Sequence, residues 1–138
     1  MIVSETVSLQ TQGFSDIIDI TPRVTAVVEG AKLKNGAVTV FCAGSTGAVT
    51  TIEYESGVLE DLKKAIERMA PSDAPYAHDR RWGDGNGFSH VRAALLGPSL
   101  SVPVIHGALA LGTWQQIVFI DFDNRKRQRK IIVQVMGE

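Results

Sequence analysis

The order in which strand-like and helix-like segments follow one another constrains this chain most. Six segments rich in β-branched residues predict strands: residues 2–9, 37–42, 49–52, 100–105, 117–122 and 131–135. Helical segments separate only some of these strands, so an α+β fold is favoured over a parallel doubly wound sheet. With 138 residues, the chain predicts one domain spanning residues 1–138.

The first helix has two possible starting points. Thr21 and Pro22 form an N-cap followed by a first-turn proline. Ile17 and Ile18, however, are costly to leave in water. We therefore expect the helix to begin near Asp16, with Pro22 marking either a kink or the true start.

Other local signals define the remaining elements. Residues 58–69 carry apolar side chains at helical spacing and predict an amphipathic helix. Residues 72–87 have no hydrophobic period and predict a long loop, after which residues 90–96 predict a short helix. Pro103 favours an edge strand or a bulge, and the last two strands are expected to form a hairpin around Asn124.

Composition excludes several classes of protein. The net charge is −1, which gives no overall attraction to nucleic acid. Cys42 is the single cysteine, so it forms no internal disulfide and no paired-cysteine zinc motif, and it is expected in the core. No apolar run reaches about 18 residues, and the N-terminal segment lacks the pattern of a secretory leader. We expect a cytoplasmic protein without a nucleic-acid or membrane partner.

Residues 76–90 hold the densest group of reactive side chains. They include His78, His90, Asp79 and Asp84. Imidazole nitrogens and carboxylate oxygens are common ligands of divalent metals and common general acids and bases. The segment predicts either a ligand or metal site, or a hydrated loop whose Asp and Asn residues form turns.

A second candidate lies between two predicted strands, at residues 44–48. Its small residues, with the hydroxyls of Ser45 and Thr46, could form a nest of N–H groups for a phosphate. The alternative is a tight β-corner in which the hydroxyls satisfy the backbone. Glu53, at the end of the following apolar strand, is costly to desolvate unless a cation or a metal pairs with it.

Two further segments could contact a substrate. Trp114 could stack on a flat ring while Gln115 reads its edge, or the tryptophan could belong to the core. Residues 125–130 hold five positive charges, which are typical of a solvated hairpin. An arginine turned inward, such as Arg129, could instead hold a phosphate through its planar fork.

Several segments together resemble the YjbQ-like family, whose members are also described as secondary thiamine-phosphate synthases. The resemblance runs nearly from end to end and is carried by residues 46–53, 76–78, 84–90, 96–100 and 111–115. It implies an α+β fold of two packed, mostly antiparallel sheets with about three flanking helices. It also implies a homotrimer or a dimer of trimers, with a pocket at or near a subunit interface.

The resemblance also implies site residues. It gives catalytic roles to His90, His78 and Glu53. Taken together with the residue patterns above, we expect substrate contacts from Ser45, Thr46, Asn86, Trp114, Gln115 and Arg129. The implied divalent metal, zinc or magnesium, would be held by His78, His90 and Asp84. Many family members have a histidine where this chain has Gly44, so the metal here would need a carboxylate or water as a further ligand.

Three functions follow as expectations. The first is a transferase that joins hydroxymethylpyrimidine diphosphate to thiazole phosphate, as a main or a side activity, with Arg129 or Arg80 neutralising the diphosphate. The second is metal-assisted hydrolysis of a small phosphorylated or carbonyl compound. The third is a non-catalytic trimer that binds a small anion.

Overall fold

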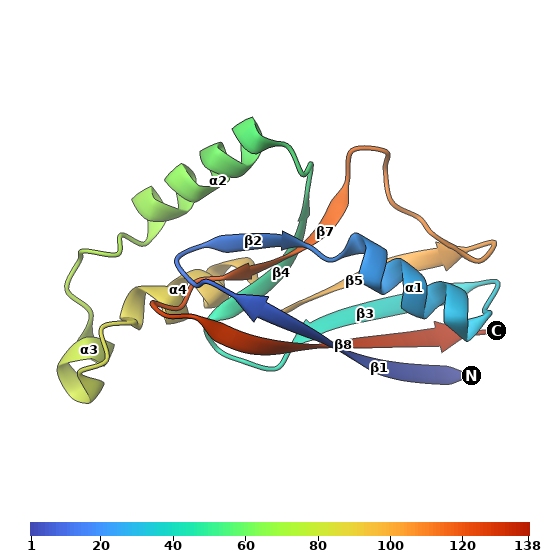
Figure 1. Cartoon of the computed structure of the whole chain (residues 1–138), viewed down its shortest axis with the longest axis horizontal. Coiled ribbons are helices and arrows are strands. Elements are labelled where there is room, and N and C mark those ends of the chain that lie inside the picture. The colour runs from blue at the N-terminus through green and yellow to red at the C-terminus, as the bar shows by residue number, and fades with distance from the viewer.

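The computed structural model describes all of residues 1–138 and contains eight strands and four helices (Figure 1). The strands are β1 (Ile2–Thr11), β2 (Asp16–Asp19), β3 (Gly36–Cys42), β4 (Gly47–Ile52), β5 (Ser99–Ile105), β6 (Ala108–Leu109), β7 (Gln116–Asp121) and β8 (Arg127–Gly137). The helices are α1 (Thr21–Ala31), α2 (Ser56–Met69), α3 (Ala77–Trp82) and α4 (Gly87–Leu96).

The strands form two antiparallel sheets. The larger sheet has the order β1-β8-β3-β5-β6, and the smaller has the order β2-β7-β4. The α+β fold with two packed antiparallel sheets is therefore confirmed. The chain termini lie side by side at one end of the larger sheet (Figure 1), where the Met1 ammonium donates to the Gly137 carbonyl at 2.9 Å.

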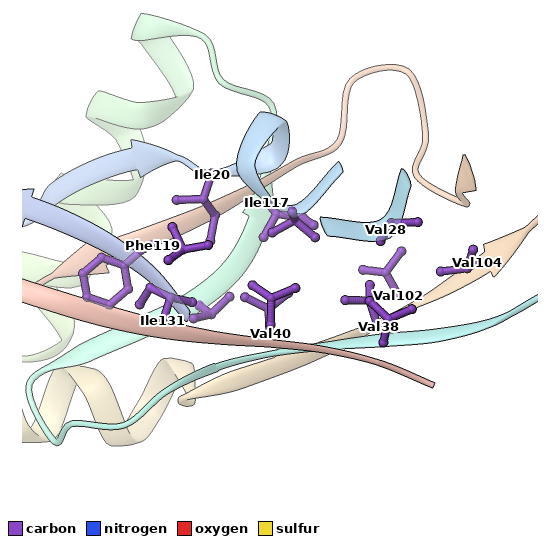
Figure 2. Packing of buried hydrophobic residues seen from close by; sticks show 14 of the residues in the cluster. Ile20, Val28, Val38, Val40, Val102, Val104, Ile117, Phe119 and Ile131 are labelled. Carbon is purple, nitrogen blue, oxygen red and sulfur yellow. The ribbon is translucent and has the colours of Figure 1, made fainter. Parts of the chain in front are cut away.

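Both faces of strand β7 are buried, so the smaller sheet lies in the middle of the molecule. Ile117 and Phe119 face the larger sheet and α1, in a core that includes Val40 and Ile131 (Figure 2). Val118, Ile120 and Phe122 face the other way, in a second core with residues of α2 and α4. Successive side chains on a strand point to opposite faces, so an uninterrupted apolar run is what this central position requires.

The outer face of the larger sheet has no covering element. Its side chains are exposed or half-buried, and cross-strand pairing arranges them in rows. One row contains Ile2, Met136, Ala37 and Pro103; a second contains Ser4, Gln134, Thr39 and Ser101; a third contains Thr6, Ile132, Phe41 and Ser99. None of these twelve side chains is charged, although charged residues make up 21% of the chain.

The helix expected to begin near Asp16 begins at Thr21 instead. Ile17 and Ile18 belong to β2, where they pair with Ile120 and Phe119 of β7. Pairing buries Ile17 without a helix, so Pro22 marks the true start and not a kink. The Thr21 side chain does not cap the helix, because its Oγ1 accepts from the Ile117 N–H at 2.8 Å.

The predicted loop over residues 72–87 contains helix α3, and α4 begins at Gly87 and not at His90. Helix α3 has no buried residue, so no hydrophobic period revealed it. The two-residue strand β6 was also not predicted, and Pro103 does lie near the sheet edge that β6 forms. Cys42 is buried, as predicted.

The expected hairpin around Asn124 is wrong. Strand β7 belongs to the smaller sheet and β8 to the larger, so the intervening residues cross from one sheet to the other. Strand β8 begins at Arg127, and therefore part of the basic segment is strand and not a solvated turn. None of the helices has the length and hydropathy needed to cross a lipid bilayer.

Candidate functional site

Two histidines that are twelve residues apart in the sequence lie face to face in the structure. His78 is in the first turn of α3 and His90 is in the first turn of α4, and their ring centroids are 4.4 Å apart with a 38° tilt. Gly83 and Gly85 have φ angles of 71° and 69°, the left-handed conformation that lets the chain reverse between the two helices. The metal site that the family resemblance implied required these two imidazoles to meet, and they do.

Two carboxylates accompany the His78 ring. Its Nδ1 lies 3.3 Å from Asp84 Oδ1 and 3.5 Å from Asp79 Oδ1. This nitrogen has no hydrogen-bond partner with acceptable geometry. One ligand atom from each of the three residues falls within a 4.8 Å group, and one imidazole with two carboxylates is a donor set that suits a divalent cation.

This group differs from the predicted metal ligands His78, His90 and Asp84. Asp79 takes the place of His90, whose ring contacts His78 but lies outside the group. Asp79 also accepts the Gly87 N–H at 2.8 Å and so ties α3 to the start of α4. The sequence signal for Asp79 as a candidate metal ligand was its position directly after His78.

The ring of His90 also borders a hollow of about 230 Å³ lined by Gly44 and Ser45. The backbone N–H groups of Gly44, Ser45 and Thr46 donate no hydrogen bond within the chain, and neither does the exposed Ser45 hydroxyl. Unpaired N–H groups on successive residues form a site for an anion. Ser45 of the predicted nest and the predicted catalytic residue His90 therefore line the same hollow.

Arg129 turns inward, as one sequence alternative proposed, but its charge is engaged by a carboxylate. Its Nε and Nη2 donate to Asp121 at 2.7 and 2.8 Å, and Nη2 also donates to Thr46 Oγ1 at 2.6 Å. Its Nη1 has no partner in the chain. A Cβ at Gly44 would come within 3.2 Å of this atom, so the free guanidinium edge faces the loop.

The Thr46 hydroxyl has a structural role and is not free to contact a substrate. Its hydroxyl donates to Asp123 Oδ2 at 3.1 Å and accepts from Arg129, and the residue is buried. Asn86 is also engaged, since its Nδ2 donates to Asp123 Oδ1 at 3.2 Å. Its Oδ1 is buried and unpaired. One acceptor of Asn86 thus remains without a partner in the chain.

Asp121 and Asp123 are two residues of this region that sequence reasoning missed. Burial by itself raises the pKa of Asp121, but hydrogen bonds from Arg129, Thr11 and the Asp123 N–H outweigh it and hold the pKa below its usual value. Burial likewise raises the pKa of Asp123, and bonds from Asn124, Asn86 and Thr46 with the Arg127 charge lower it overall. The sequence signal for these two residues was one aspartate at the end of an apolar strand and a second aspartate shortly after it.

Glu53, Trp114 and Gln115 do not share the hollow of the histidines within one chain. Glu53 follows β4 and is exposed, whereas Thr46 precedes β4, so about 23 Å of extended backbone separates them. Gln115 lies at the Glu53 end, where its Nε2 donates to Thr51 Oγ1 at 3.2 Å. Trp114 is 73% exposed and is not a core residue. In one chain, the expectation that Glu53 is desolvated and joins the histidines is wrong.

The geometry offers three chemical functions at one end of the fold. His78, Asp79 and Asp84 could hold a divalent cation. The Gly44–Thr46 loop and Arg129 Nη1 present unpaired donors to an anion. His90 lies between these two groups and can transfer a proton to a bound molecule.

Comparison with known proteins gives consistent matches along the chain. The family model described as UPF0047 protein YjbQ-like matches residues 5–138. A UPF0047 protein of Methanothermobacter thermautotrophicus is 41% identical over 137 residues, which cover 99% of this chain and 94% of that protein. A UPF0047 protein of Archaeoglobus fulgidus is 42% identical over 129 residues, covering 94% of this chain and 98% of that protein.

Solved structures match equally well. A YbjQ-like protein of unknown function from Sulfolobus solfataricus superposes with a TM-score of 0.95 at 31% identity, covering 100% of this chain and 99% of that one. An uncharacterised protein of the yjbq/upf0047 family from Clostridium acetobutylicum gives a TM-score of 0.87 at 32% identity, covering 96% and 99%.

Proposed function

The chain belongs to the UPF0047 YjbQ-like family, and on that premise we propose that it binds a small phosphorylated substrate and a divalent cation where His78 and His90 meet. One observation carries the proposal. Unpaired N–H groups of Gly44 and Ser45 border the hollow that His90 lines, with Arg129 Nη1 close to Gly44, and the His90 ring contacts His78 of the His78, Asp79 and Asp84 group.

The reaction we propose is the transfer of a hydroxymethylpyrimidine group from its diphosphate to the nitrogen of a thiazole phosphate. The bond from the pyrimidine methylene carbon to the diphosphate oxygen breaks, and a bond from that carbon to the thiazole nitrogen forms. Pyrophosphate leaves with the electron pair. Charge develops on the leaving group, so stabilising that charge should dominate catalysis.

Each part of the site has a role in this proposal. A divalent cation, zinc or magnesium, held by His78, Asp79 and Asp84 would supply positive charge for the diphosphate. The Gly44–Thr46 N–H groups and Arg129 Nη1 bind its remaining oxygens. His90 donates a proton to, or accepts one from, the oxygen nearest its ring.

Hydrolysis is the second candidate, because the site is open to water. The Asp84 side chain is 49% exposed and that of His78 is 29% exposed. A water molecule attacking the phosphorus of the same substrate would release phosphate without a thiazole partner. The transferase and the hydrolase therefore differ in their products, and a non-catalytic binder gives neither product.

A product assay separates the three functions. The purified protein is incubated with the pyrimidine diphosphate and Mg²⁺ or Zn²⁺, with and without thiazole phosphate, and pyrophosphate, phosphate and thiamine phosphate are quantified. We expect thiamine phosphate and pyrophosphate only with both substrates. Phosphate release without thiazole phosphate would establish the hydrolase instead, and binding without products would leave the anion-binding function.

Histidine variants test the site itself. His90→Ala should abolish turnover while the melting temperature stays nearly unchanged, since His90 is only half-buried. His106→Asn is the matched control, because His106 is the third histidine and lies in an exposed turn with φ of 50°, which asparagine tolerates. Full activity in His90→Ala would exclude the proposed role.

We also propose that the protein assembles as a homotrimer, or a dimer of trimers, through the outer face of the larger sheet. The twelve side chains of these three rows form an uncharged part of this face, next to the row that contains Ser8 and Lys130, and an uncharged area suits an interface between copies.

A further inference from the structure

A cavity of about 400 Å³ lies on the opposite side of α4 from His90. Phe88 and Arg92 line it and lie one turn apart on α4. His90 is two residues from each, about 200° around the helix. The cavity is therefore separate from the proposed catalytic site, and its volume is within the range of small-molecule sites.

A buried arginine lies in the wall of this cavity. Arg92 is 4% exposed; its Nε donates to the Ala70 carbonyl at 2.9 Å, its Nη1 donates to Ser15 Oγ at 3.2 Å, and its Nη2 pairs with Glu67. A guanidinium carries five N–H groups, and these bonds occupy three of them. Two N–H groups of a buried cation remain without an acceptor in the chain.

Other donors around the cavity are also free. The Ser15 hydroxyl is buried and accepts from Arg92, but it donates to no group in the chain. Lys63, one turn before Glu67 on α2, forms no ion pair. The lining has a net charge of +1, because Lys63 and Arg92 are positive and Glu67 is negative. The cavity thus has donors and charge for a ligand with a single negative charge.

Aromatic rings provide the apolar part of the lining. The Phe88 ring is buried, and the Arg92 guanidinium lies 4.8 Å from its centroid. Phe14 is 66% exposed beside the cavity, at the middle of three consecutive left-handed residues: Gly13, Phe14 and Ser15 have φ of 76°, 54° and 65°. This conformation is costly for phenylalanine and serine, and such strain concentrates at ligand sites.

We propose that this cavity binds a small aromatic carboxylate. The carboxylate accepts from the two free Arg92 N–H groups and the Ser15 hydroxyl and lies near the Lys63 ammonium, and the ring packs against Phe14. A carboxylate matches the net charge of the lining better than a doubly charged phosphate does. This inference does not rest on the proposed transferase, since the two sites share no residue.

Benzoate is the probe that tests the proposal. Titration of ¹⁵N-labelled protein should shift the amide resonances of Phe14, Ser15 and Arg92 saturably. Benzylamine carries the same ring with a positive charge and should not bind, and phenyl phosphate should bind more weakly than benzoate. No saturable shift with benzoate, equal binding of benzylamine, or tighter binding of phenyl phosphate would each overturn the proposal.

Surface variants keep the test independent of folding. Lys63→Gln should weaken benzoate binding about fivefold, because an exposed charge contributes up to roughly 1 kcal/mol. Phe14→Ala should weaken it by a similar factor through the lost ring contact. Lys64→Gln, at the neighbouring exposed lysine paired with Glu60, is the matched control and should bind benzoate as the wild type does. Equal affinity in all three variants would contradict the assigned contacts.

Discussion

The Arg129 guanidinium joins the two sheets by holding the Asp121 carboxylate through two hydrogen bonds, of 2.7 Å from Nε and 2.8 Å from Nη2. Arg129 lies on β8 of the larger sheet and Asp121 on β7 of the smaller sheet. Both side chains are buried, so each charge depends on the other. The same pair fixes the guanidinium edge that faces Gly44.

Removal of one partner of this pair should be costly. We expect Asp121→Ala to lower the free energy of unfolding by about 3–5 kcal/mol, because it leaves the Arg129 charge buried and unpaired. The Asp121→Leu/Arg129→Met double variant should recover much of that loss. Urea unfolding measures both, with exposed Asp61→Ala as a control that should change stability by less than about 0.5 kcal/mol. A loss equal to that of the control would contradict the buried-pair description.

The stability of the protein should fall at acidic pH. The folded-state pKa values of Asp121 and Asp123 lie below the ordinary value of 3.8, so the unfolded chain takes up protons first as the pH falls. The stabilisation is complete well above pH 3.8 and is lost as the pH falls through the lower folded-state values. Urea midpoints measured from neutral to acidic pH should show this decline. In Asp121→Asn, which starts from a lower stability, the decline should be shallower.

Two glycines should respond in opposite ways to the same substitution. A Cβ at Gly47 would lie 2.6 Å from Phe119 Cζ, and that ring is fully buried. Gly47→Ala should therefore destabilise the protein by about 1–3 kcal/mol through overpacking. Gly30, on α1, has open space at its Cβ, and Gly30→Ala should stabilise by about 0.5–1 kcal/mol. Thermal unfolding of the two variants gives the comparison, and a neutral Gly47→Ala would show that the ring can move aside.

A charge on the outer face of the larger sheet should dissociate the proposed assembly. Ile132→Glu places a carboxylate in the row that contains Phe41, where burial against another copy would be costly. Sedimentation equilibrium should show a smaller oligomer than the wild type, whereas Asp61→Lys, on exposed α2, should leave the mass unchanged. A wild-type protein that is monomeric at all concentrations would exclude the interface.

Removal of one carboxylate should weaken cation binding at the histidines. Asp84→Asn removes a charged oxygen 3.3 Å from His78 Nδ1, and we expect a loss of at least about tenfold in Zn²⁺ affinity measured by calorimetry. Asp73→Asn, an exposed residue of the preceding segment, is the control. Equal affinity in the two variants would show that Zn²⁺ binds elsewhere.

Local sequence patterns predicted the elements in which the buried side chains follow a single periodicity. The apolar run of β7 and the stripe of α2 were recognised because one periodicity describes each of them. Ile17 and Ile18 were misassigned because two isoleucines fit a short strand and a helix equally well, and only pairing with β7 decides between them. Helix α3 was missed because it buries nothing.

The candidate site, like the fold, was predicted only in part. The order of the residues was enough to show which side chains are candidates for chemistry and to show the resemblance to a known family, because both are properties of the local sequence. The folded arrangement was needed to show that β7 and β8 enter different sheets, that Asp79 joins His78, and that Glu53 lies a strand's length from the loop beside His90. These are contacts between segments distant in the chain, fixed by how the two sheets bury their apolar faces, and no local pattern encodes them.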